Sequence, residues 1–86
     1  MMNVIEYLSQ KSNEELCGYY AELFYGGKDN ISEDAEVRKL VRAINEGIER
    51  GEIQSNGLSG IVYVGTIWPE LCHVMADRFY KSKISR

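Results

Sequence analysis

The side chains best suited to catalysis lie near the C-terminal end of the chain. The only histidine, His73, directly follows Cys72. Neighbours on a helix point about 100° apart, so this pair is not a nucleophile with its base. Glu70 and His73 have the Glu-x-x-His spacing of half a di-metal site, with Asp77 one turn further on, but such a site needs a second Glu-x-x-His pair. We therefore expect no catalytic residues, no metal, no cofactor and no enzymatic activity.

The cysteine content indicates a reducing compartment. Cys17 and Cys72 are the only cysteines, whereas small secreted domains held by disulfides usually carry about four to eight. The first ten residues lack the basic and apolar regions of a signal peptide. We expect a cytoplasmic protein in which both thiols are small buried groups beside the apolar faces of helices.

Charge patterning disfavours nucleic acid as the partner. The chain has a net charge of −3, with −5 in residues 1–52 and +2 in residues 53–86. A winged-helix-like DNA-binding regulator is the alternative function, in which Arg38, Lys39 and Arg42 of a recognition helix would face the groove. That helix would present acidic residues first, and its wing, residues 53–65, carries no lysine or arginine.

One face of the first long helix predicts a protein-binding strip. Glu14, Gly18, Ala21 and Tyr25 fall within about 60° of one another at 100° per residue. A glycine inside a helix costs about 1 kcal/mol relative to alanine, so Gly18 needs a reason such as the close approach of another backbone. That backbone belongs either to this chain or to a partner.

Acidic residues at the start of the second long helix extend this prediction. Glu33, Asp34 and Glu36 crowd its first turn, where they favour the positive end of the helix dipole. Together with the strip they would steer a basic protein towards the surface, and Tyr25 would anchor it. We expect a small acidic protein-binding module, an inhibitor, immunity or accessory regulatory protein of bacterial or phage type. A homodimer is a further expectation, since so short a chain buries a limited core.

The segment from Ser32 to Val41, SEDAEVRKLV, looks like the acidic start of the second helix in immunity proteins of nuclease bacteriocins. Proteins of that family bind a basic nuclease domain through acids and tyrosines. Their short Tyr-Tyr-Pro helix has no counterpart here, so we do not assign the chain to the family.

The helices follow from capping residues and apolar spacing. Residues 3–10 form a short amphipathic start. Ser12 and Glu15 have capping-box spacing ahead of a helix that ends at Gly26-Gly27. Ser32 is the predicted N-cap of a helix over residues 33–50, which Gly51 terminates. The last helix opens around Pro69, and its tail is expected to fray from Arg78 onward.

A β-hairpin is predicted between the last two helices. Ile61 to Val64 is a β-branched and aromatic run, and Asn56-Gly57 is typical of a type I′ turn. Residues 53–55 would be the partner strand. The fold class is thus α+β, mostly α. We expect a single domain, residues 1–86, with three to four short helices around one core and a two-stranded β-hairpin before the last helix.

No apolar run is long enough to span a membrane.

The predicted core is Leu16, Tyr20, Leu23, Val37, Leu40, Val41, Ile44, Ile48, Val62, Val64, Leu71, Val74, Met75 and Phe79.

Overall fold

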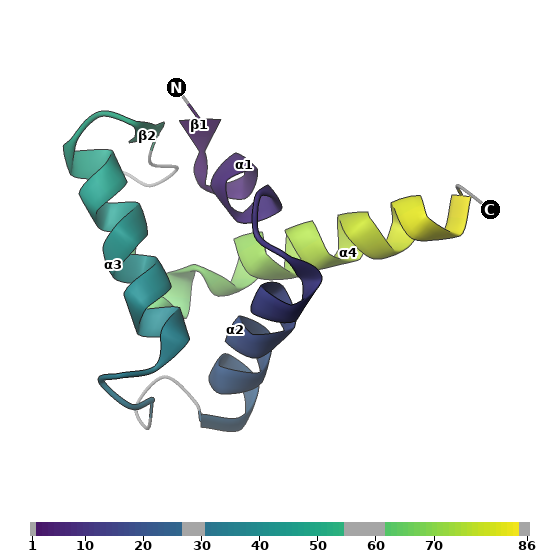
Figure 1. The fold of residues 1–86 in the computed structure, drawn as a ribbon, viewed down its shortest axis with the longest axis horizontal. Helices are drawn as coiled ribbons and strands as arrows, with labels where there is room; N and C mark the ends of the chain where they lie inside the picture. Colours follow the sequence, from purple (N-terminus) through teal and green to yellow (C-terminus); the bar gives the residue numbers. More distant parts are fainter. Residues whose placement is uncertain (1, 27–30, 55–61, 85–86) are drawn as a thin grey trace.

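Four helices surround one apolar core in the part of the chain that the computed structural model describes, residues 2–26, 31–54 and 62–84. Two short strands close one end of the helical arrangement (Figure 1). The elements in chain order are β1 (Met2–Asn3), α1 (Val4–Ser9), α2 (Asn13–Gly26), α3 (Glu36–Glu49), β2 (Ile53–Gln54), a 3-10 turn (Val64–Thr66) and α4 (Trp68–Ile84). The mostly helical α+β class is confirmed.

Two capping boxes begin the first two helices. The Ser12 hydroxyl accepts the Glu15 N–H, and the Glu15 carboxylate accepts the Ser12 N–H, both at 3.1 Å, as predicted. Asn3 and Glu6 form the same reciprocal pair ahead of α1, which the sequence analysis missed. Each box satisfies backbone donors that a helix start leaves without partners.

Helix α3 begins later than predicted. Its N-cap residue is Ala35 and not Ser32, and the Ala35 side chain makes no capping hydrogen bond. The Ser32 hydroxyl instead accepts the Asp34 N–H at 3.2 Å, which makes a local turn that competes with a helix start. The other end of α3 is as predicted, because Gly51 adopts the left-handed backbone conformation at φ 78°.

The strand pairing differs from the predicted hairpin. Strand β2 pairs in parallel with β1, with Met2 opposite Ile53 and Asn3 opposite Gln54. Of the predicted strand Ile61 to Val64, Val62 and Tyr63 lie in a loop and Val64 begins the 3-10 turn, whereas Ile61 lies outside the described residues, as does the Asn56-Gly57 turn. The Asn45 side chain accepts the Val62 N–H and donates to the Val62 carbonyl, both at 2.8 Å, so it takes the place of a neighbouring strand.

Most of the predicted core is confirmed. Eight of the predicted residues are buried and five are half-buried against them. The prediction that Phe79 is a core residue is wrong, because 65 % of it is exposed on the C-terminal half of α4. On α2, Tyr19 is buried and Tyr20 only half-buried, so the core row is Leu16, Tyr19 and Leu23. The core residues missed from the sequence are Val4, Leu8, Tyr19, Ile31, Ile53 and Ile67.

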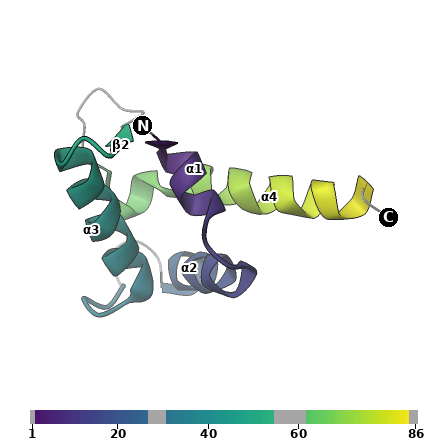
Figure 2. The same cartoon turned by 45° about the horizontal axis from the view of Figure 1, so that its top comes forward.

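Helix α4 does not fray at Arg78. It continues to Ile84, and its C-terminal half projects beyond the other helices in both views (Figures 1 and 2). The Arg78 guanidinium donates to the Asn13 side chain at 2.8 Å, to the Ser9 carbonyl at 2.7 Å and to the Lys11 carbonyl. These contacts tie the middle of α4 to the turn between α1 and α2. None of the described helices has the length and apolar character that crossing a bilayer requires.

Candidate functional site

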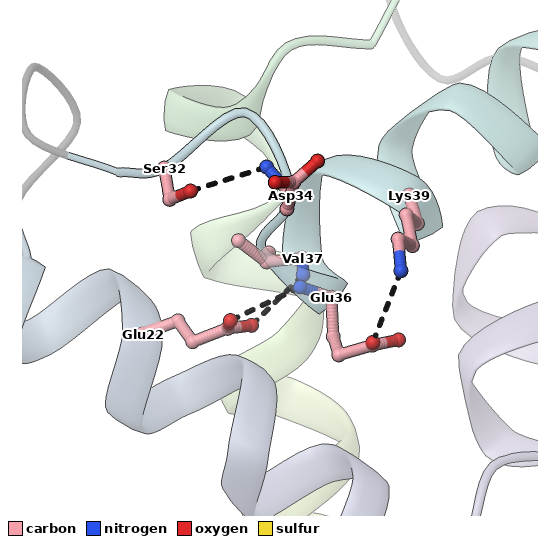
Figure 3. A network of polar contacts seen from close by, with 6 residues as sticks. All are labelled: Glu22, Ser32, Asp34, Glu36, Val37 and Lys39. Carbon is pink, nitrogen blue, oxygen red and sulfur yellow. Dashed lines mark hydrogen bonds and ion pairs between the residues drawn. The ribbon is translucent and has the colours of Figure 1, made fainter.

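The junction between α2 and α3 is organised by one carboxylate. The Glu22 side chain, on α2, accepts the Glu36 N–H at 3.0 Å and the Val37 N–H at 2.8 Å (Figure 3). These are the first backbone donors of α3, and the positive end of a helix dipole favours a negative charge there. Glu22 therefore caps a helix that carries no side-chain cap of its own, and it fixes the start of α3 beside the outer face of α2.

A first shallow groove lies on one side of this junction. Its volume is about 390 Å³, and it brings together Glu14, Gly18 and Glu36 from the two predicted clusters. The remaining lining residues are Glu15, Tyr19 and Glu22. A Cβ built on Gly18 would meet none of the described atoms within 4 Å. Of the two alternatives for Gly18, packing by this chain's own backbone is not found among the described residues, and contact with a partner stays a prediction.

A second groove lies on the other side of Glu22. Its volume is about 380 Å³, and it brings together the predicted residues Ala21, Tyr25 and Asp34. The side chain of Tyr25 is the most exposed large hydrophobic of the described chain at 83 %. Its ring meets the Phe24 ring edge to face, with centroids 5.0 Å apart. A wide, exposed aromatic beside a carboxylate is suited to contact a cationic side chain.

The two grooves lie on one surface, and carboxylates give both of them negative charge. We define the acidic α2–α3 surface by its carboxylates, which are Glu14, Glu15, Glu22, Glu33, Asp34 and Glu36. Glu33 is exposed and precedes Asp34 in the chain, although it lines neither groove. The Lys39 ammonium lies 3.4 Å from Glu36, but both side chains are more than half exposed, so this pair is worth little.

Two titrating groups of this surface are perturbed. The pKa of Glu15 is lowered because its carboxylate accepts the Ser12 backbone N–H and stays charged. The pKa of Tyr19 is raised, first by burial of its hydroxyl and then by the neighbouring charge of Glu15. The Glu15 carboxylate is therefore held in its charged form, and the Tyr19 hydroxyl remains a hydrogen-bond donor.

The three bases of the DNA-binding alternative have different surroundings. The half-buried Arg38 guanidinium donates to the carbonyls of Ile31 and Ser32 at 3.0–3.1 Å, so it holds the segment ahead of α3. Lys39 pairs with Glu36, as described above. Arg42 is exposed. The helix that carries these bases starts at the acidic α2–α3 surface.

The residues first considered for catalysis lie along α4 in different surroundings. His73 is exposed, Glu70 is half-buried, and Asp77 pairs with Lys81 at 2.9 Å. Residues 2–26, 31–54 and 62–84 contain no group of three or more metal-ligating side chains. Both cysteines are free thiols, but Cys17 is exposed, so the prediction of a buried thiol there is wrong.

Glu22, the residue that joins the two clusters, is not among the residues predicted from the sequence. Glu22 lies four residues beyond Gly18 and about 40° further around the helix, so helical spacing places it beside the predicted strip. Its role as a cap could not be found that way, because the helix it caps starts 14 residues later.

Comparison with protein-family models, curated proteins and solved structures found no match for this chain.

Proposed function

We propose that this protein is a non-enzymatic binding module whose acidic α2–α3 surface recognises a basic surface of another protein. The observation that supports this proposal is that two clusters separated in sequence line adjoining grooves on either side of Glu22. Carboxylates surround these grooves, and Tyr25 stands exposed at one of them. Such a surface steers a basic partner by charge and anchors it by an aromatic ring.

We propose an inhibitor, immunity or accessory regulatory protein, which would act by covering a basic surface of its target. The free thiols of Cys17 and Cys72 are consistent with action in a reducing cytoplasm. The partner is defined here by its chemistry, a folded protein with an exposed cluster of lysine or arginine.

Capture from a native lysate tests the proposal. The full chain, immobilised at one end, should retain one stoichiometric basic protein at low salt and release it as salt rises. Tyr25→Ala and Asp34→Lys should each weaken capture at least about ten-fold, because they remove the anchor and reverse a charge beside it. Glu49→Lys is the matched control, since Glu49 is exposed at the far end of α3. Capture of no stoichiometric protein, or equal loss with the control, would contradict the proposal.

DNA binding is tested separately. The phosphate contribution to DNA binding does not depend on sequence, so random duplex at low salt is a sufficient probe. No binding at micromolar protein would remove the winged-helix-like alternative. Binding that Arg42→Ala weakens and Tyr25→Ala does not would favour it over the protein-binding proposal.

A further inference from the structure

Tyr19 brings an unpaired hydroxyl to the first groove of the acidic α2–α3 surface. Only 7 % of Tyr19 is exposed, so its ring belongs to the core. Its hydroxyl makes no hydrogen bond with any part of residues 2–26, 31–54 and 62–84. Within those ranges, the one side-chain atom that is both closed off from solvent and unpaired belongs to Glu70. The Tyr19 hydroxyl is therefore accessible, and it opens into the groove that Tyr19 lines.

Four carboxylates line the groove together with this hydroxyl. Glu14, Glu15 and Glu22 belong to α2, and Glu36 belongs to the first turn of α3. Burial raises the pKa of Tyr19 most, and the negative charges of Glu15, Glu36 and Glu22 raise it further. The phenol thus keeps its proton among these charges. Its oxygen can still accept a hydrogen bond from a ligand, because a phenol is both donor and acceptor.

Several carboxylate oxygens of the groove are left unused by the fold. Glu22 uses both of its oxygens to cap α3. Glu15 uses Oε1 in the capping box of α2, and Glu36 uses Oε1 for Lys39. The Oε2 atoms of Glu15 and Glu36, and the whole Glu14 carboxylate, accept no hydrogen bond from the described part of the chain. A cationic ligand in the groove would find acceptors on both helices.

The distribution of these acceptors favours a guanidinium over a metal ion or an ammonium. In the described chain, no three metal-ligating side chains come close enough to hold a metal ion, so the acceptors do not converge on one point. A guanidinium spreads five N–H donors over a planar fork, whereas an ammonium concentrates three donors on one strongly hydrated atom. Acceptors that are separated on two helices are therefore better matched by the guanidinium.

Gly18 leaves the space that such a group needs. A Cβ at Gly18 would meet none of the described atoms within 4 Å, and the groove has a volume of about 390 Å³. The charge of Lys11 acts on Glu15, but the Lys11 ammonium lies over the Tyr7 ring, 5.2 Å from its centroid, and Lys11 does not line the groove. The groove is thus open to a cation from outside the chain.

We propose that the groove at Gly18 binds one arginine side chain of the basic partner, and that the Tyr19 hydroxyl accepts a guanidinium N–H. The Glu14 carboxylate and the free oxygens of Glu15 and Glu36 accept the other donors. This inference rests on the proposed function, to which it adds the residue type that enters the first groove. An arginine held by acceptors on two helices is typical of the few residues that carry most of a binding free energy.

Titration of the full chain with N-acetyl-arginine amide, followed by NMR at low salt, tests the site. The backbone amide signals of Gly18 and Tyr19 should shift and saturate with a dissociation constant on the order of 1 mM, since a single side chain is bound. N-acetyl-citrulline amide, in which a neutral urea replaces the guanidinium, should shift neither signal. N-acetyl-lysine amide should bind at least about three-fold more weakly, because its ammonium is a compact, strongly hydrated charge.

Three variants separate binding from folding. Tyr19→Phe removes only the hydroxyl and should raise the dissociation constant about five- to ten-fold, with no loss of melting temperature because the hydroxyl has no partner in the described chain. Gly18→Leu should abolish binding by filling the groove, while leucine suits the helix better than glycine. Glu14→Gln should weaken binding at least about three-fold, whereas its matched control Glu49→Gln, at the far end of α3, should leave the constant unchanged.

Equal dissociation constants for wild type and Tyr19→Phe, or equal shifts at Gly18 with the arginine and citrulline amides, would overturn the proposal. Equal affinity for the lysine amide would overturn the assignment to a guanidinium. Lysate capture that depends on Tyr25 and Asp34 but is unchanged in Tyr19→Phe would overturn the arginine site and leave the proposed function standing. Binding of the arginine amide without capture of any protein would contradict the proposed function and would replace the partner's arginine by a free guanidinium compound.

Discussion

The Glu22 carboxylate accepts the Val37 N–H at 2.8 Å across 15 residues of sequence. The start of α3 is thus held by a side chain of α2 and not by a residue of its own segment. The same carboxylate lies at both grooves of the acidic α2–α3 surface. One residue therefore links the packing of two helices to the shape of the candidate binding surface.

Replacing Glu22 should measurably destabilise the fold. Glu22→Ala should lower the free energy of unfolding by about 1–2 kcal/mol, because two backbone donors of α3 lose their acceptor. Glu22→Gln keeps one amide oxygen as an acceptor, so its free energy of unfolding should lie between those of wild type and Glu22→Ala. Glu14→Ala on the same helix is the control, expected within about 0.5 kcal/mol of wild type. Denaturant unfolding measures all three, and equal stability of Glu22→Ala and Glu14→Ala would contradict the cap.

Asn45 should hold the segment ahead of the 3-10 turn. Asn45→Ala should lower the free energy of unfolding by about 1–3 kcal/mol, because the half-buried N–H and carbonyl of Val62 both lose a partner. Hydrogen exchange provides the local measurement, in which the Val62 amide should exchange faster in the variant. Gln54→Ala, an exposed amide in β2, should leave that exchange rate as it is. Unchanged protection in Asn45→Ala would show that Val62 is held by other contacts.

The same substitution at two helical glycines should have opposite effects. Gly18→Ala should stabilise the chain by about 0.5–1 kcal/mol, since alanine is the better helix former and its methyl group meets open space. Gly47→Ala should destabilise it, because the new Cβ would lie 2.5 Å from Cδ1 and 2.9 Å from Cγ1 of Ile53. Thermal melting of the two variants checks the signs. If Gly18 contacts a partner, Gly18→Ala should also weaken capture while it raises the melting temperature.

The capping box of α2 should make part of the stability depend on pH. The pKa of Glu15 in the folded chain lies below its ordinary value of 4.5, so the charged form stabilises the fold. This contribution is fully present above the ordinary value and is lost as pH falls through the folded value. Wild type should therefore be more stable than Glu15→Gln at neutral pH, and the difference should vanish on acidification. A difference that is independent of pH would contradict this assignment.

Short-range patterns were enough to predict most of the helices. The Ser12 to Glu15 capping box, the glycine stops at Gly26 and Gly51 and the apolar spacing of α3 depend on neighbours within a turn or two. Such contacts form in the same way whatever the rest of the chain does. The acidic strip on α2 was predictable for the same reason, because helical geometry alone places its side chains on one face.

Contacts between distant segments decided the rest. Ser32 makes a local turn, and Glu22 caps α3 in its place. Strand β2 pairs with β1, and not with the neighbouring segment that the predicted hairpin required. Phe79 has the spacing of a core residue, yet 65 % of it is exposed in the C-terminal half of α4. Apolar spacing specifies which face of a helix is apolar, but whether that face is buried depends on how far the neighbouring elements extend. Likewise, the packing of α3 against α2 brings Asp34 to the groove of Tyr25 and Glu36 to the groove of Gly18. These residues are too far apart in the sequence for helical spacing to place them together.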